Sequence, residues 1–374
     1  MKTSPAQMKS SPVQAKPRPF VSLIMPVRNE AGFIARGLEA VLGQDYPAER
    51  MEVLVVDGMS DDGTREVVSS FAERYARLRL LDNPGRIVPT GLNLALREAT
   101  GEIIVRVDGH CEIAPDYVSR SVQCLEEEEA DGVGGPIETI GDTRTARAIA
   151  LAMSSKFGVG GSAFRTIKDR RMFVETVAFP AYTRRAIERA GLFDEELVRN
   201  QDDEYNYRLC KLGGRLLLAP EIRSRYYSRS SFRSLWRQYF QYGYWKVRVM
   251  QKHPRQMRLR QFAPPLFVAS LAVALTLAPF SVPGALALGL LLITYALLNL
   301  AASVIALRGV EAGLLPLLLL AHPTLHLSYG AGFLVGLVRF WNRWAQGRSP
   351  SGEAVSAERD LLKQAGVRAD ERSL

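Results

Sequence analysis

Apolar runs alternate with segments of helical spacing over the first hundred residues. The apolar runs have strand character and lie at Val21–Val27, Glu52–Val56, Leu78–Leu81 and Ile103–Val107. The helical segments between them are Ala31–Leu42, Thr64–Ala76 and Val88–Ala99. Strands that alternate with helices of about 10–15 residues are typical of crossover units in a mostly parallel sheet. We therefore predict an α/β, Rossmann-like head.

The alternation becomes less regular after Val107. We expect helices at Pro115–Glu129, Thr143–Phe157, Arg184–Ala190 and Asn200–Lys211, and a strand at Phe173–Phe179. The segment Gly132–Pro136 contains three glycines and a proline, which favour turns. We interpret it as a tight connection.

Two long uncharged stretches follow the head, at Gln261–Leu307 and Ala312–Val338. Uncharged apolar stretches of more than about 18 residues indicate membrane spans. The first stretch is too long for one crossing of a core about 30 Å thick, and Ser281–Gly284 divides it into two spans. Pro323 lies near the middle of the second stretch and would interrupt a helix, so one kinked span or a re-entrant pair is possible. The basic tail belongs in the cytoplasm under the positive-inside rule, which favours an even number of crossings and the re-entrant pair.

The segment 231–260 is aromatic, amphipathic and basic. We predict an interfacial helix lying along the membrane surface, although a helix packed on the head has the same pattern, and one helix can do both. Its cations mark a cytoplasmic juxtamembrane anchor and are Lys246, Arg248, Lys252, Arg255, Arg258 and Arg260. The net charge of +9 therefore does not indicate nucleic acid, and no nucleic-acid-binding motif accompanies it.

The domain boundaries follow from these patterns. We expect a disordered leader at 1–19, a catalytic head at 20–230, the interfacial segment at 231–260, a membrane region at 261–340 and a charged tail at 341–374. Three cysteines without a recognisable spacing indicate a reducing compartment. The head should thus lie on the cytoplasmic side of the inner membrane.

Polar residues follow each of the four predicted strands, and ligands of open α/β sheets bind at such strand ends. Asp108 and His110 follow the fourth strand and are our candidate ligands for a divalent cation; the alternative is an ordinary turn with Asp108 as a helix cap. Neither the dinucleotide fingerprint nor the P-loop motif occurs, which argues against dehydrogenases and P-loop NTPases. Asp202, Asp203 and Glu204 open a predicted helix and suit its dipole, but three consecutive carboxylates exceed what a cap requires.

These pieces together resemble family 2 inverting glycosyltransferases with the GT-A fold, and most closely the bacterial exopolysaccharide enzymes of the succinoglycan-biosynthesis type. The matching segments are Val21–Glu30, Val55–Thr64 and Asn83–Asn93. Val107–His110 lies where the family has Asp-x-Asp, and Gln201-Asp202 where it has Glu-Asp. Gln241–Trp245 resembles the family's Gln-x-x-Arg-Trp element.

The resemblance implies roles for individual residues. Asp57 would hydrogen-bond the base of a UDP-sugar, and Pro26, Arg28 and Glu30 would shape the nucleoside pocket. Arg86 would approach the diphosphate. Asp108 and His110 would hold Mn²⁺ or Mg²⁺ as a Lewis acid, and Asp202 would be the base that deprotonates the acceptor hydroxyl. Gln241 and Trp245 would border the acceptor region.

Three positions depart from the family pattern. His110 replaces the second Asp of Asp-x-Asp, and imidazole is a better ligand for Mn²⁺ than for Mg²⁺. Gln201 replaces a Glu beside the base, and Tyr244 replaces the Arg of Gln-x-x-Arg-Trp.

The resemblance leads us to expect an enzyme that transfers one sugar, with glucose the expected one, to a polyprenyl-diphosphate-linked saccharide at the membrane. A processive polysaccharide synthase is one alternative, but it normally has more spans and the complete Gln-x-x-Arg-Trp element. A non-catalytic membrane scaffold that binds nucleotide is another.

Overall fold

The head is built on an eight-stranded sheet, seen in a computed structural model that describes residues 17–344; the expected leader and charged tail lie almost entirely outside these residues. The strand order is β3-β2-β1-β4-β9-β6-β10-β8. Its strands are β1 (Val21–Val27), β2 (Met51–Asp57), β3 (Leu78–Asp82), β4 (Ile103–Arg106), β6 (Gly132–Gly135), β8 (Met172–Val174), β9 (Ala178–Thr183) and β10 (Leu216–Leu218). A second sheet has the order β5-β11-β7 and consists of β5 (Cys111–Ile113), β7 (Ile137–Ile140) and β11 (Ser224–Tyr227).

The first four strands confirm the predicted parallel half of the sheet. β1 pairs in parallel with β2 and β4, and β2 pairs in parallel with β3. The connecting helices are α1 (Ile34–Leu42), α2 (Thr64–Ala72) and α3 (Val88–Glu98). β9 is antiparallel to both β4 and β6, so the sheet is mixed but mostly parallel.

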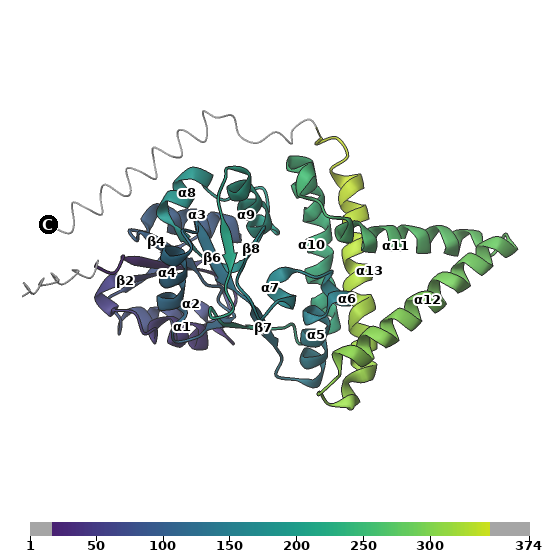
Figure 1. Cartoon of the computed structure of the whole chain (residues 1–374), viewed down its shortest axis with the longest axis horizontal. Helices are drawn as coiled ribbons and strands as arrows, with labels where there is room; N and C mark the ends of the chain where they lie inside the picture. The colour runs from purple at the N-terminus through teal and green to yellow at the C-terminus, as the bar shows by residue number, and fades with distance from the viewer. Residues whose placement is uncertain (1–16, 345–374) are drawn as a thin grey trace, which may run out of the picture.

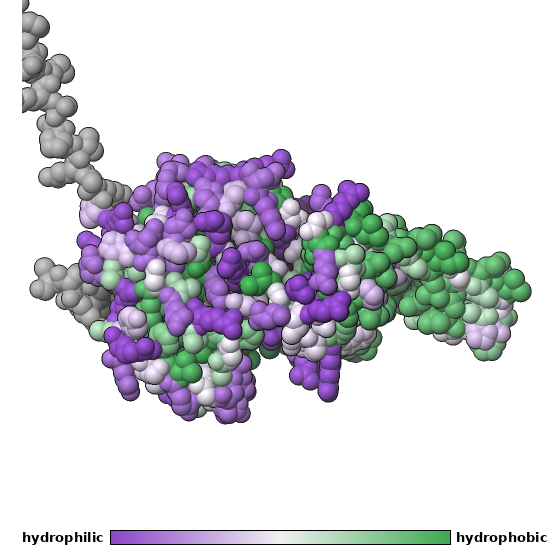
Figure 2. All heavy atoms as spheres, turned by 90° about the horizontal axis from the view of Figure 1, so that it is seen from below, coloured by the Kyte–Doolittle hydropathy of each residue, from purple (hydrophilic) through white to green (hydrophobic). Residues whose placement is uncertain are grey.

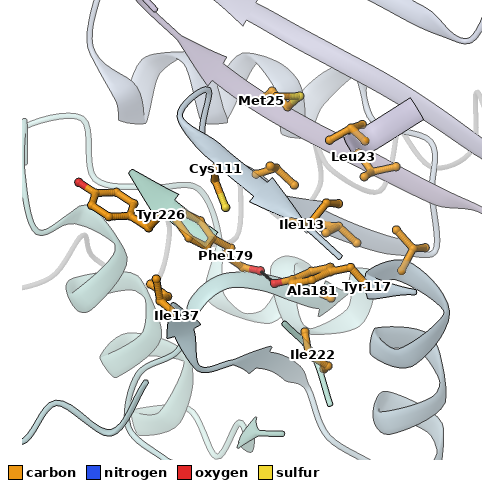
Figure 3. Close-up of a cluster of buried hydrophobic side chains, with 14 of the residues drawn as sticks. Leu23, Met25, Cys111, Ile113, Tyr117, Ile137, Phe179, Ala181, Ile222 and Tyr226 are labelled. Atoms are coloured by element: carbon orange, nitrogen blue, oxygen red, sulfur yellow. Dashed lines mark hydrogen bonds between the residues drawn. The ribbon is translucent and has the colours of Figure 1, made fainter. Parts of the chain in front are cut away.

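Both faces of the sheet are covered, which explains why its central strands are mainly apolar. All seven residues of β1 are buried. Alternate side chains point to opposite faces: Leu23 belongs to a core shared with α1, α2 and α4 (Tyr117–Glu127), and Ile24 to one shared with α3, α8 (Arg184–Ala190) and α9 (Gln201–Lys211). Figure 3 shows the first core, where the Tyr117 hydroxyl donates to the Phe179 carbonyl at 2.6 Å.

The glycine-rich segment is a strand, so our prediction of a connection at Gly132–Pro136 was wrong. β6 lies between β9 and β10, and its four residues are buried. A Cβ at Gly135 would lie 1.4 Å from the Ile222 carbonyl oxygen, and one at Gly132 would lie 2.6 Å from the Leu216 side chain. The glycines therefore serve close packing rather than turning. The expected strand Phe173–Phe179 is likewise divided between β8 and β9.

The remaining helices form the membrane region or connect it to the head. They are α5 (Arg144–Ser154), α6 (Lys156–Val159), α7 (Ala163–Thr166), α10 (Phe232–Lys252), α11 (Leu259–Leu277), α12 (Val282–Ala306) and α13 (Leu315–Arg339). Three short 3₁₀ helices lie at Ala48–Arg50, Pro254–Gln256 and Ala312–Leu314. Figure 1 shows α7 between the sheet and α10, and α6 lies against α13.

Three helices in the described part of the chain are long and apolar enough to cross a membrane: α11, α12 and the segment Ala312–Arg339 that contains α13. α11 and α12 project from the head as a hairpin (Figure 1) whose surface is apolar (Figure 2). In the third segment 44% of the most apolar stretch is buried inside the protein, against 11% in α11 and 11% in α12. α13 continues through Pro323 as one helix rather than as a re-entrant pair.

Glycines allow α13 to pack closely against α10. A Cβ at Gly332 would lie 2.0 Å from the Phe240 carbonyl oxygen, and one at Gly243 would lie 2.0 Å from the Tyr329 carbonyl oxygen. Gly336, one turn after Gly332, similarly faces the carbonyl of Tyr244. Small residues four apart let helix backbones approach in this way. The α10–α13 pair is thus held by backbone contact that no larger residue permits.

We expect Gly332→Ala to separate α10 from α13, because its Cβ would meet backbone that cannot move independently. The expected loss is about 1–3 kcal/mol, as for other overpacked sites, measured by thermal unfolding of the intact protein in detergent. Gly289→Ala on α12 is the matched control, since a Cβ there meets nothing within 4 Å. Equal melting temperatures for the two variants would contradict this packing.

Candidate functional site

One cavity of about 1160 Å³ lies between the strand ends of the head and the helices of the membrane region. It exceeds the roughly 300–1,000 Å³ of an ordinary small-molecule pocket, so it has room for two ligands. Its lining contains most of the residues singled out from the sequence, namely Pro26, Arg28, Glu30, Arg86, Asp108, His110, Asp202 and Gln241. Asp57 and Trp245 do not line it.

The Asp57 carboxylate is used inside the turn that follows β2. It is fully buried and accepts hydrogen bonds from the Ser60 hydroxyl at 2.5 Å and the Ser60 amide at 3.1 Å. Arg65 also pairs with it at 3.4 Å. Gly58, the next residue, does line the cavity. In this conformation Asp57 therefore fixes a turn beside the cavity, and direct contact with a base stays a prediction.

A buried arginine joins two carboxylates of the site, one at a strand end and one at the start of α9. Arg106 ends β4, its side chain is only 6% exposed, and its guanidinium donates to Asp108 at 2.9 and 3.0 Å. The same guanidinium forms an ion pair with Asp202 at the start of α9. A buried charge is costly unless it is paired, so this arginine holds both carboxylates in place. The sequence did contain a signal, because Arg106 is the one charged residue in an otherwise apolar strand.

Asp202 and Asp203 have different surroundings, although both line the cavity. Asp203 forms an ion pair with Lys246 of α10, whose side chain is buried. The Asp203 carbonyl also accepts a hydrogen bond from Gln256 at 2.8 Å. Asp203 is thus tied to the membrane-proximal helices, while Asp202 faces the strand ends through Arg106. This difference favours Asp202 as the residue available to a substrate.

His110 and Asp108 offer a donor set that fits a divalent cation. His110 Nδ1 lies 2.9 Å from Glu30 Oε1, and a carboxylate on one imidazole nitrogen orients the other toward a metal. Within residues 17–344, neither His110 Nε2 nor Asp108 Oδ2 has a hydrogen-bond partner. No cluster of three or more metal-ligating side chains occurs among the described residues. Any cation held here would therefore need further ligands from a substrate.

Two exposed cations border the opposite side of the strand ends. Arg28 donates to the Arg86 carbonyl at 3.1 Å, and Arg86 has a positive φ of 59°. Neither forms an ion pair within the part of the chain that the structure describes. Guanidinium groups without carboxylate partners suit phosphate binding.

Gln241 and Trp245, expected together near an acceptor, are separated. The Gln241 amide oxygen accepts from Arg199 at 3.1 Å within the cavity lining. Trp245 packs instead against Tyr244 and Phe340. The predicted Gln-x-x-Tyr-Trp element is therefore half in the site and half in the helix packing.

Comparisons with known proteins agree with this architecture. Residues 22–192 match the family model "Glycosyl transferase family 2". The chain is 32% identical over 325 residues to the succinoglycan biosynthesis protein ExoA of Rhizobium meliloti, covering 86% of this chain and 96% of that protein. It is also 30% identical over 241 residues to a protein of Methanococcus voltae, covering 62% of this chain and 74% of that one. That protein is the dolichyl N-acetyl-alpha-D-glucosaminyl phosphate 3-beta-D-2,3-diacetamido-2,3-dideoxy-beta-D-glucuronosyltransferase.

A solved structure shares the fold. The mannosyltransferase PcManGT from Pyrobaculum calidifontis, in complex with GDP-Man and Mn²⁺, has a TM-score of 0.58 at 24% identity, over 86% of this chain and 87% of that one. The sheet topology and the strand-end cavity define a GT-A fold with C-terminal helices. The chain belongs to glycosyl transferase family 2.

A buried ion pair supports the helix that carries Asp202. Glu204 lies two residues later in α9, is 2% exposed, and is bonded by Arg208 at 2.9 Å and by His253 at 3.0 Å. Burial raises the pKa of Glu204, but the hydrogen bond from His253 and the charge of Arg208 outweigh it and lower the pKa to about 2. Because the folded pKa is depressed, this stabilisation is present above the unfolded value near 4.5 and is lost as the pH falls toward about 2.

We expect Glu204→Gln to remove that pH dependence and to destabilise the protein at neutral pH by about 3 kcal/mol, because it breaks a buried pair. The measurement is the melting temperature as a function of pH. Glu66→Gln, at an exposed position of α2, is the control and should melt as the wild type does. A Glu204→Gln curve that runs parallel to the wild-type curve at low pH would refute this role.

Proposed function

We propose that the chain is an inverting glycosyltransferase that moves one sugar from a UDP-sugar to a lipid-linked saccharide in exopolysaccharide biosynthesis, with glucose as the expected sugar. The observation that carries this is the Arg106 bridge, which joins the strand-end carboxylate Asp108 to Asp202 within one cavity. The similarity to ExoA over nearly its whole length supports the pathway. The head would work on the cytoplasmic face of the inner membrane.

The donor would bind at the strand ends. Pro26, Arg28 and Glu30 would shape the nucleoside pocket, Asp57 would hold its turn or contact the base, and Arg86 would approach the diphosphate. PcManGT, which shares the fold, is complexed with GDP-Man and Mn²⁺, and this supports a nucleotide sugar as the donor. Two unpaired guanidinium groups at the rim supply the positive charge that a diphosphate requires.

Asp108 and His110 would hold the cation, Mn²⁺ or Mg²⁺. When bound, it would neutralise charge on the departing nucleoside diphosphate. The hydrogen bond between His110 and Glu30 fixes the ring and leaves one nitrogen toward the cavity, which favours Mn²⁺ over Mg²⁺.

Asp202 would act as the general base. Its carboxylate would take the proton of the acceptor hydroxyl while that oxygen bonds to the anomeric carbon. The bond from that carbon to the nucleoside diphosphate breaks, and UDP leaves with the electron pair. A single displacement inverts the anomeric centre. Arg106 would orient the carboxylate for this transfer.

The processive alternative finds less support. Of the Gln-x-x-Arg-Trp element, Arg is replaced by Tyr244, and Trp245 packs away from the cavity. A non-catalytic scaffold would not need Asp202 to face the donor site.

We expect Asp202→Asn to lower turnover by about 10²–10⁴-fold, the usual contribution of a positioned base, with UDP affinity unchanged. Sugar transfer to a membrane lipid extract and calorimetric UDP binding measure the two quantities. Asp203→Asn is the paired comparison and should lose less, because Lys246 ties that carboxylate to α10, whereas Arg106 joins Asp202 to the strand-end residue Asp108. If Asp203→Asn is the more damaging change, the base is Asp203.

We expect EDTA to abolish transfer and Mn²⁺ to restore it more fully than Mg²⁺. His110→Asp would introduce a harder oxygen ligand and should shift the preference toward Mg²⁺. The ratio of the two metal-activated rates measures this preference. Sugar transfer that continues after complete chelation would show that the enzyme needs no divalent cation, and Asp108 and His110 would then not be metal ligands.

A further inference from the structure

The cavity has a second wall, built from cations and from membrane-region helices, that the donor site does not use. Its basic residues come from five separate segments and are Lys156, Arg165, Arg229, Arg237 and Arg260. All five line the same cavity as the strand-end carboxylates. Arg165 and Arg229 are half-buried and the other three are exposed, so the wall combines cations of five segments around one cavity and is not the surface of a single helix.

These five cations form no ion pair with any residue in the range 17–344, whereas most of the acidic lining residues do. Arg165 donates to the Thr139 hydroxyl at 3.0 Å and lies over the Tyr226 ring. Arg260 donates to the Gly161 carbonyl at 3.1 Å. These contacts orient two of the guanidinium groups and leave their charge uncompensated. Several uncompensated cations around one space favour a multivalent anion.

The same lining contains aromatic and apolar side chains from α6 and from the membrane region. They are Phe157 of α6, Phe267 of α11 and Leu325 of α13, together with Tyr295 and His326. Tyr295 and His326 are bonded to each other at 2.9 Å, and His326 also bonds the Phe157 carbonyl at 2.9 Å. Their polar atoms are thus paired, and their rings offer mainly apolar surface. α11 and α13 belong to the segments long enough to span a membrane.

We propose that this wall binds the phosphate groups of a polyprenyl phosphate or diphosphate, with the first isoprene units lying against Phe157, Phe267 and Leu325. The assignment rests on the proposed function, since it locates the anchor of the acceptor whose sugar hydroxyl would reach Asp202. A free nucleotide would use the cations but not the apolar surface beside them. A bilayer phospholipid would not need a cavity that continues to the strand ends.

The test is binding of farnesyl diphosphate to the intact protein in detergent, with saturating UDP present to occupy the donor site. We expect farnesyl diphosphate to bind about tenfold or more tightly than either farnesol or inorganic pyrophosphate, because only the diphosphate ester satisfies both halves of the wall. The paired change Arg165→Gln with Arg229→Gln should weaken farnesyl diphosphate binding by about tenfold or more and leave UDP binding unchanged.

A second pair, Lys156→Gln with Arg237→Gln, removes two exposed cations and should have the same effect without disturbing the fold. Arg255→Gln is the control, since Arg255 is equally exposed but does not line the cavity. It should bind farnesyl diphosphate as the wild type does.

Three results would overturn the proposal. Displacement of farnesyl diphosphate by UDP would assign the cations to the donor. Unchanged farnesyl diphosphate affinity in both pairs, with reduced binding to phosphatidylglycerol vesicles, would assign them to the membrane surface. An affinity for pyrophosphate equal to that for farnesyl diphosphate would show that the isoprene chain contributes nothing to binding.

Absence of sugar transfer in the wild-type protein would count against the proposed function instead, because these binding measurements do not depend on turnover.

Discussion

The site depends on one buried guanidinium. Arg106 is fixed by β4 in the middle of the sheet, and it binds Asp108 on its own strand end and Asp202 at the start of α9. Removing either carboxylate would take away one of the two partners of a buried charge, and breaking such a buried pair is strongly destabilising. The chain must therefore bring α9 to the end of β4 whenever it folds. A candidate base and a candidate metal ligand are brought together by the same requirement.

A second set of polar contacts couples this arrangement to the membrane region. The Asn200 side chain donates to the Tyr242 carbonyl at 2.9 Å, and Asp203 is paired with Lys246. Arg248 binds Glu196 at 2.7 Å and, with Lys252, lowers the pKa of that carboxyl to about 2. All these contacts join the loop and first turn around Asp202 to α10. Since α10 is packed against α13 through glycines, the position of the candidate base depends on the helices at the membrane.

The hydrophobic pattern of the sequence was sufficient to predict those elements whose residues are chosen by burial alone. The first four strands were predictable because strands buried on both faces are apolar along their whole length. β6 was not, since the need for glycine at 132 and 135 comes from Leu216 and Ile222, more than 80 positions away. Asp202, the distant partner of Arg106, and Asp203, the partner of Lys246, lie on α9, and no periodicity shows these pairings. Asp57 and Trp245 were placed in the site by resemblance, but their contacts in this structure are with neighbouring side chains.

The two ends of the cavity carry different charges. Carboxylates lie at the strand ends and the start of α9, and the rim cations Arg28 and Arg86 also follow strands, whereas the unpaired cations of the second wall come from α6, α7, α10, α11 and the loop before α10. Two anionic groups can thus be bound in one cavity without competing for the same positive charge. Asp202 lies between the two regions, held by Arg106 on the strand side. An acceptor anchored by its phosphate at the second wall would extend its sugar toward the Asp202 carboxylate. The distance between the phosphate site and Asp202 would then limit the length of the saccharide and so decide which of its hydroxyl groups receives the new sugar.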